Sequence, residues 1–209
     1  MSHCTTYPMV FQDKCLLFKA MRDLEMEPEN VAWEMYGSSL LKGLGIGGES
    51  IGKLLTGSKY GLNLTFEETE QGLQPMFETD ALFGEERAIV EERLLSEVET
   101  AYLRCAVEET AKKYRESGLF AEVREKRTEE GVSFVLKFGT GNKSVTVTKS
   151  PDGVIEETVQ GVMGRSCTDA TAPLERLLSS ANTPVERTWT PAYQANVEDR
   201  ELKVLRLTR

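Results

Sequence analysis

The sequence predicts an α+β protein: an antiparallel sheet backed by one long and one short helix, followed by a small hairpin–helix–strand unit. Three observations support this. Residues 85–117 carry apolar residues at helical spacing. Several shorter segments alternate apolar and polar residues, as half-buried strands do. Finally, Pro151-Asp152-Gly153 stands between two such segments and is typical of a tight hairpin turn.

The first elements are short. Residues 2–11 favour a strand, and Pro8 suits an edge strand better than a central one. Asp13 is the expected N-cap of a short helix that ends near Pro28 and packs Cys15 against its neighbours. Alternation then predicts strands over residues 31–35, 60–66 and 73–77, the last two joined by a turn.

The long helix is the strongest signal in the chain. Its apolar stripe runs from Val90 to Cys105, and we expect Cys105 in the core. Glutamates crowd its first turns and basic residues its last, as the helix dipole prefers, and Gly118 supplies a residue that ends the helix. A hairpin over residues 119–127 and 132–138 follows.

A domain joint is expected at Gly139–Asn142, because these residues are small and polar. The first domain would cover residues 1–139. The second, a small ββαβ unit with a C-terminal extension, would cover residues 143–209. Its helix is expected over residues 168–180, with Pro173 tolerated in the first turn or so, and further strands over residues 187–189 and 201–207.

Charge and composition narrow the range of expected partners and the expected compartment. The net charge is −9, and the one basic cluster, residues 124–127, is interleaved with glutamates, so no nucleic-acid partner is expected. No apolar run approaches the roughly 18 residues that span a bilayer, so no membrane partner is expected either. Four scattered cysteines without a CxxC pair and without a secretory signal predict a cytoplasmic protein with free thiols, no metal site and no cofactor.

Two family resemblances enter at this point. Met1-Ser2-His3, Tyr36-Gly37 and Tyr60-Gly61-Leu62 lie within residues 1–138, which resemble the family called domain of unknown function twelve-fifty-seven. That family includes a hypothetical chloroplast reading frame, number thirty-five. Cys4 stands where the family usually has Phe, and the loop from Gly37 to Lys59 looks longer than usual.

The second resemblance covers about residues 143–193. Its motif residues are Pro151, Asp152, Gly153, Gly161, Gly164, Cys167 and Leu174-Glu175. They resemble the family called domain of unknown function twenty-nine-ninety-seven. Neither family has an assigned activity. Together they imply a fusion of two modules that occur near AAA-type ATPases, so the resemblance implies a protein partner, with such an ATPase as the candidate.

The glycine-rich loop contains two motif matches. Gly43, Gly45 and Gly48 fit GxGxxG, while Gly47 together with Gly52 and Lys53 fits GxxxxGK. Leu54 stands where a P-loop needs Ser or Thr for Mg²⁺, and no buried strand leads directly into the loop. A flexible partner-binding loop is therefore the favoured interpretation, and nucleotide binding by Gly47–Lys53 is a weaker alternative.

Two single residues offer other chemistry. Cys167 precedes a predicted helix N-terminus, where a thiolate is stabilised; a small packed residue is the alternative. His3, the only histidine, is expected at a surface or strand edge. The sequence thus predicts a non-catalytic adaptor module of unassigned oligomeric state, with a thiol-dependent redox protein or enzyme using Cys167 as the alternative.

Overall fold

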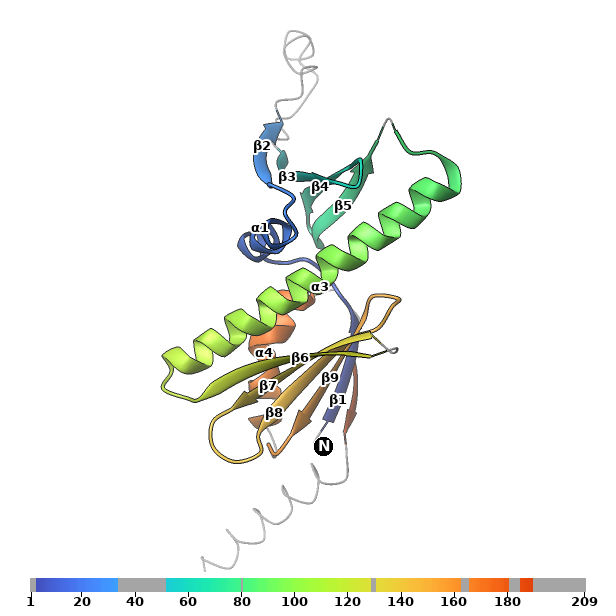
Figure 1. Ribbon diagram of the computed structural model, residues 1–209. Coiled ribbons are helices and arrows are strands. Elements are labelled where there is room, and N and C mark those ends of the chain that lie inside the picture. The colour runs from blue at the N-terminus through green and yellow to red at the C-terminus, as the bar shows by residue number, and fades with distance from the viewer. Residues whose placement is uncertain are drawn as a thin grey trace, which may run out of the picture. The chain divides into compact units, whose positions relative to one another are not determined.

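A computed structural model gives the structure of the chain. It describes residues 3–33, 52–79, 81–128, 131–162, 166–180 and 185–189. Helices and antiparallel sheets are both present (Figure 1), so the prediction of an α+β protein is confirmed.

The chain divides into two compact units. One combines Met1–Gln12 with Leu103–Arg209, and the other is Asp13–Tyr102. We call them the six-stranded unit and the four-stranded unit, after the sheet that each contains. The long helix α3, Gly84–Glu116, passes through residue 102 and contributes to both. In sequence, the four-stranded unit is therefore an insertion within the six-stranded unit.

The six-stranded unit contains an antiparallel sheet of order β10-β1-β9-β8-β7-β6. Strands β6 to β9 are consecutive neighbours, whereas β1, from the start of the chain, lies between β9 and β10. The strands are β1 (His3–Pro8), β6 (Ala121–Thr128), β7 (Gly131–Phe138), β8 (Ser144–Lys149), β9 (Val154–Gln160) and β10 (Glu186–Trp189).

One face of this sheet carries the core of the unit. Alternate side chains of β7 and β8, such as Phe134 and Val147, are fully buried. Helix α4 (Ser166–Leu178) covers this face (Figure 1) and buries Leu174. The second half of α3 adds Tyr114, whose ring stacks on Phe138 with centroids 5.0 Å apart. The Tyr114 hydroxyl also donates to the Ala170 carbonyl of α4 at 2.7 Å.

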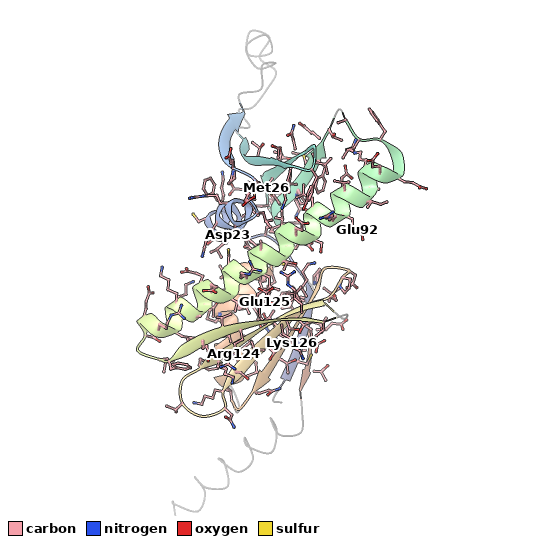
Figure 2. All side chains as sticks on the ribbon, viewed as in Figure 1. Asp23, Met26, Glu92, Arg124, Glu125 and Lys126 are labelled. Carbon is pink, nitrogen blue, oxygen red and sulfur yellow. The ribbon has the colours of Figure 1, made fainter. Side chains whose placement is uncertain are left out.

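The outer strand β6 carries charge along its length. Arg124, Glu125 and Lys126 follow one another on this strand (Figure 2). Charged side chains on an edge strand discourage pairing with the strands of other molecules. The basic residues are also paired with acids, since Arg124 Nε lies 2.9 Å from Glu122 Oε1 and Arg127 Nε lies 2.8 Å from Glu125 Oε1.

The four-stranded unit has the sheet order β2-β3-β4-β5. Its helix α1 begins after Asp13, whose carboxylate accepts from the Cys15 and Leu16 amides at 2.8 and 3.0 Å, so the predicted N-cap is confirmed. Phe66 of β4 is fully buried. The elements are α1 (Lys14–Asp23), β2 (Glu29–Trp33), β3 (Gly52–Lys59), β4 (Leu62–Thr69), β5 (Gly72–Glu78) and the first part of α3.

The joint expected at Gly139–Asn142 is not a boundary between compact units. These residues form the turn between β7 and β8, which pair directly from Val132 and Lys149 to Lys137 and Ser144. The strands on either side therefore belong to one sheet, and the divisions fall near residues 12 and 102 instead. The expected separate hairpin–helix–strand unit is likewise part of this larger sheet.

Strand β1 is central and not at the edge. Pro8 is the last residue of β1, and the pairing of β1 with β10 covers only His3–Thr6. The missing N–H of Pro8 therefore interrupts no hydrogen bonds between β1 and β10. Two further expectations were wrong. Cys15 is exposed, because it lies off the buried face of α1. Helix α1 ends at Asp23, well before Pro28.

Pro173 lies inside α4 and not in its first turn. A proline there has no N–H to give to the carbonyl four residues earlier, that of Asp169. The expected strand over residues 201–207 lies outside the described residues.

Candidate functional site

The motif residues of the second resemblance build a turn. Pro151, Asp152 and Gly153 connect β8 to β9, and the Gly153 amide donates to the Ser150 carbonyl at 3.1 Å. Gly153 has a φ of 80°, which suits glycine. The Ser150 hydroxyl donates to the Asp152 carboxylate and holds the pKa of that carboxyl below its usual value. These contacts account for the motif structurally, without a reactive group.

Gly161 allows a close approach of two chain segments. Its φ is 70°, and a Cβ at this position would lie 2.4 Å from the Asn142 carbonyl oxygen. A glycine is therefore required where the end of β9 passes the turn before β8. Gly164 lies outside the described residues.

The structure places the backbones of His3 and Cys167 but does not describe their side chains. His3 opens β1 and pairs with Val159 on one side and Trp189 on the other. The sequence predicts Cys167 just before a helix; it is instead the second residue of α4 and lies in the first turn of that helix. Ser2 lies outside the described residues.

The glycine-rich segment is described only at its end. Gly43, Gly45, Gly47 and Gly48 lie outside the described residues. Gly52 and Lys53 are the first residues of β3 and pair with Trp33 and Ala32 of β2. A P-loop places its Gly-Lys pair at the start of a helix, so this part of the motif is in the wrong structural context for nucleotide binding.

A buried acid lies in the core of the six-stranded unit. Glu157 of β9 is 0% exposed, and its Oε1 accepts a hydrogen bond from the hydroxyl of the buried Tyr7. Burial raises the pKa of Glu157 to about 8, and the negative charge of Glu175 adds to the rise. Burial, together with the neighbouring Glu157, also raises the pKa of Tyr7.

A second acid links α4 to β10 beside this pair. Glu175 accepts from the Thr171 hydroxyl at 2.9 Å and from Arg187 Nη2 at 2.5 Å. Burial and the nearby Glu157 also raise the pKa of Tyr114 on α3, to about 12. We call the set Thr5, Tyr7, Glu157, Glu175 and Arg187 the Glu157 cluster; its first three members are buried, Glu175 is partly buried and Arg187 is exposed.

The chemistry of this cluster is limited by its burial. A carboxyl with a pKa near 8 can exchange a proton near neutral pH. Glu157 and Tyr7 are 0% and 1% exposed, so a substrate in solution does not reach them in this conformation. The cluster therefore bears on stability and its pH dependence.

Sequence reasoning missed Glu157, although a signal was present. Ile155 and Val159 on either side of it along β9 point inward, and strand alternation puts Glu157 on the same face. A carboxylate at an inward position is rarely buried without a partner, so it marks a position for close inspection.

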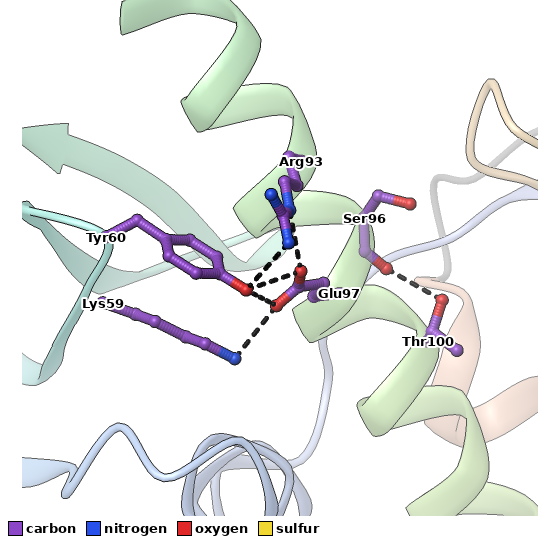
Figure 3. A network of polar contacts seen from close by, with 6 residues as sticks. All are labelled: Lys59, Tyr60, Arg93, Ser96, Glu97 and Thr100. Atoms are coloured by element: carbon purple, nitrogen blue, oxygen red, sulfur yellow. Dashed lines mark hydrogen bonds and ion pairs between the residues drawn. The ribbon is translucent and has the colours of Figure 1, made fainter.

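A second polar network joins β3 to α3 in the four-stranded unit (Figure 3). The Tyr60 hydroxyl donates to Glu97 at 2.9 Å and accepts from Arg93 Nη2 at 3.3 Å. Lys59 Nζ lies 3.0 Å from Glu97 Oε2. The Arg93 guanidinium and the Lys59 ammonium lie 4.7 and 5.0 Å from the centroid of the Tyr60 ring.

The backbone at Tyr60 is unusual for this side chain. Its φ is 58°, in the left-handed region, where a bulky residue is strained. Tyr60 and Gly61 form the two-residue turn between β3 and β4, and both have positive φ, 58° and 77°, as a type I′ turn requires. The Tyr60 hydroxyl and the Lys59 ammonium both bind Glu97 of α3, and Arg93 binds the same hydroxyl. These contacts hold the turn against the helix.

A shallow polar hollow lies beside β3 in the same unit. It is lined by Glu25, Met26, Glu27, Thr56, Gly57, Ser58 and Asn63. Glu25 and Glu27 both have positive φ, 60° and 46°, and carry the chain around the buried Met26. Its polar lining residues, apart from the half-buried Thr56, are exposed, as expected of a solvated surface.

Two searches of the described part of the chain are negative. No three His, Cys, Asp or Glu side chains gather there in a way that would hold a metal ion. No helix within those residues is both long enough and apolar enough to cross a bilayer.

Comparison with known proteins finds one similarity. Residues 145–194 match a family described as "Protein of unknown function (DUF2997)". The match begins in β8 and covers β9, α4 and β10, so it supports the second of the two resemblances seen in the sequence. No curated protein and no solved structure matches the chain significantly.

Proposed function

We propose that this protein is a non-catalytic interaction module that binds a protein partner. The observation that carries the proposal is the exposure of two large apolar side chains around the start of α3. Phe83 is 74% exposed and Ile89 is 65% exposed, and both belong to the four-stranded unit.

These side chains have the chemistry of interface anchors. Aromatic and large aliphatic residues bury much apolar area on binding, and a few such residues dominate typical interfaces. Exposed Glu85 and Glu86 lie between them in the chain. The expected partner surface therefore offers an apolar recess with basic residues at its rim.

The reactive groups of the described residues also favour binding over catalysis. The carboxyl with the strongest shift, Glu157, is inside the core. Burial and the neighbouring Glu156 raise the pKa of the Cys4 thiol, so this thiol is disfavoured as a thiolate nucleophile.

The finer identity of the partner rests on the sequence resemblances. Residues 1–138 resemble the family that includes the chloroplast reading frame, and this resemblance together with the second one implies an AAA-type ATPase as a candidate partner. The loop from Gly37 to Lys59 is a further candidate contact. Its last part, Gly52–Lys59, forms β3, so a loop variant must be confined to Gly43–Gly48 to preserve the sheet.

The test compares two double variants of the full chain. Phe83→Ser with Ile89→Ser removes the proposed anchor, and Leu119→Ser with Phe120→Ser removes two other exposed apolar side chains, in the six-stranded unit. Proteins that copurify from the native cell are measured by quantitative mass spectrometry. The first variant should lose the partner at least about tenfold, which corresponds to roughly 1.4 kcal/mol, with an unchanged melting temperature.

The control variant should retain the partner. Equal retention by both variants would contradict the anchor, and a partner list without an AAA-type ATPase would contradict the finer assignment. Replacement of Gly43–Gly48 by a serine-rich segment of equal length tests the loop separately.

Cys167 remains the second candidate, as a thiol-dependent redox or catalytic residue. Its position in the first turn of α4 favours a lowered thiol pKa. The test measures the alkylation rate of Cys167 as a function of pH, which gives the apparent pKa of its thiol. Cys4, Cys15 and Cys105 are replaced by Ser or Ala, so that only Cys167 reacts. An apparent pKa near that of a free thiol, about 8.5, would remove the reason for this candidate.

A further inference from the structure

Thr5 and Glu157 lie side by side in the core of the six-stranded unit. They are directly opposite each other in the antiparallel pairing of β1 with β9. Residues opposite each other in such a pair project from the same face of the sheet. Both are 0% exposed, so this face is the covered one.

One oxygen of each side chain has no hydrogen-bond partner. These oxygens are Thr5 Oγ1 and Glu157 Oε2, and both are buried. The other carboxyl oxygen, Oε1, is occupied by the Tyr7 hydroxyl. Buried side-chain polar atoms almost always have a partner, either from the protein or from an ordered water.

The polar groups around this pair are already engaged. Glu175 binds Thr171 and Arg187, and the Tyr114 hydroxyl donates to the Ala170 carbonyl. The pairing therefore places two residues with unused buried oxygens directly opposite each other, while Glu175 and Tyr114 are committed elsewhere.

We propose that one water molecule is bound inside the six-stranded unit and bridges Thr5 Oγ1 and Glu157 Oε2. A water needs two to four polar partners at a buried site, and these two oxygens supply the first two. It accepts a hydrogen bond from one group and donates to the other, as a hydroxyl and a carboxyl require.

Water fits this position better than a cation. Burial raises the pKa of Glu157 to about 8, so the carboxyl is mainly neutral at pH 7 and attracts a cation weakly. Glu175, whose charge also raises this pKa, already forms an ion pair with Arg187. A neutral carboxyl beside a hydroxyl is a good site for a water that both donates and accepts.

The substitution Thr5→Val distinguishes a bound water from an unsatisfied Thr5 hydroxyl by the sign of the change in melting temperature. Valine has nearly the same shape and lacks the hydroxyl. If the water is present, the variant leaves Glu157 and the water short of a partner, and the melting temperature should fall by about 2–4 °C. If no water is present, the variant removes an unsatisfied buried hydroxyl, and the melting temperature should rise.

Thr6→Val is the matched control, because Thr6 is the next residue of β1 and points to the opposite face of the sheet. Both variants replace threonine by valine in the same strand, so their comparison removes the effect of the higher strand preference of valine on the melting temperature. A melting temperature of Thr5→Val equal to or above that of Thr6→Val would overturn the proposal.

A crystal structure of the wild-type chain tests the site directly. Density for a single water within hydrogen-bond distance of both oxygens, retained in Thr5→Ser and lost in Thr5→Val, is the expected result. A direct hydrogen bond between Thr5 and Glu157 would overturn the proposal. An anomalous signal at the site after a rubidium soak would also overturn it, by assigning the ligand as a monovalent cation.

Discussion

The Tyr60 hydroxyl donates to Glu97 at 2.9 Å from a residue whose φ is 58°. The turn between β3 and β4 demands a positive φ, and a tyrosine accepts it poorly. The contact across to α3 supplies a reason for a tyrosine at this position. The hydroxyl reaches the helix, and the ring lies close to two cations, Lys59 and Arg93.

The substitution Tyr60→Phe tests this relationship, because it removes the hydroxyl and leaves the ring and the backbone unchanged. Loss of the bonds to Glu97 and Arg93 should lower the free energy of unfolding by about 0.5–1.5 kcal/mol. Urea denaturation of the full chain measures it. In a Glu97→Gln background the same substitution should cost less, and an equal cost in both backgrounds would argue against coupling through Glu97.

Glu157→Gln should flatten the dependence of stability on pH. The folded pKa of Glu157, about 8, is raised above the usual glutamate value of 4.5, so the folded state holds the proton more tightly than the unfolded state. Stability therefore falls as pH rises from about 4.5 to about 8, with a limiting slope of about 1.4 kcal/mol per pH unit from this group.

The measurement is the difference in unfolding free energy between Glu157→Gln and wild type at several pH values. Glutamine does not ionise, so the variant should gain on the wild type steadily across this window. A difference that stays constant between pH 5 and pH 8 would show that the folded pKa of Glu157 is not raised. Glu156→Gln, exposed on the same strand, is the control.

Gly161→Ala should destabilise the six-stranded unit more than Gly141→Ala. Both glycines have positive φ, 70° and 81°, so both variants carry a backbone penalty of about 1–2 kcal/mol. Only at Gly161 would the new Cβ meet backbone, at 2.4 Å from the Asn142 oxygen, which adds about 1–3 kcal/mol. Thermal unfolding of the two variants side by side measures the difference. Equal losses would mean that the close approach relaxes easily.

Asp13→Ala should lower stability by about 1 kcal/mol, through loss of the N-cap of α1. The carboxylate accepts from two amides at the start of the helix. Asp13→Asn keeps a side-chain oxygen in the same place and should cost clearly less. Chemical denaturation followed by circular dichroism compares the two, and an equal loss in both would indicate that charge, not capping, is the main contribution.

Local elements were largely predictable from the sequence. The stripe from Val90 to Cys105, the cap at Asp13 and the turn at Gly153 each depend on residues close in the chain, and all appear where they were expected. Helical spacing, capping and turn chemistry act over a few residues, so a pattern of that length can predict them.

Long-range pairing was not predictable in the same way. Gly139–Asn142 has the composition of a linker, but the pairing of β7 with β8 makes it a hairpin turn. The position of β1 between β9 and β10 depends on partners about 150 and about 180 residues away. The roles of Tyr60 and Glu157 were missed for the same reason, because Glu97 and Tyr7 are distant in sequence.

The central position of β1 determines when the six-stranded sheet can form during synthesis. This strand is synthesised before every other described element, yet both of its neighbours, β9 and β10, are synthesised after β2 to β8. The four-stranded unit has almost all of its residues available by then and can fold early, since domains form as units during translation. The N-terminal residues must stay unpaired until the rest of the six-stranded sheet arrives, so a chain stopped before residue 154 would expose an unpaired β1.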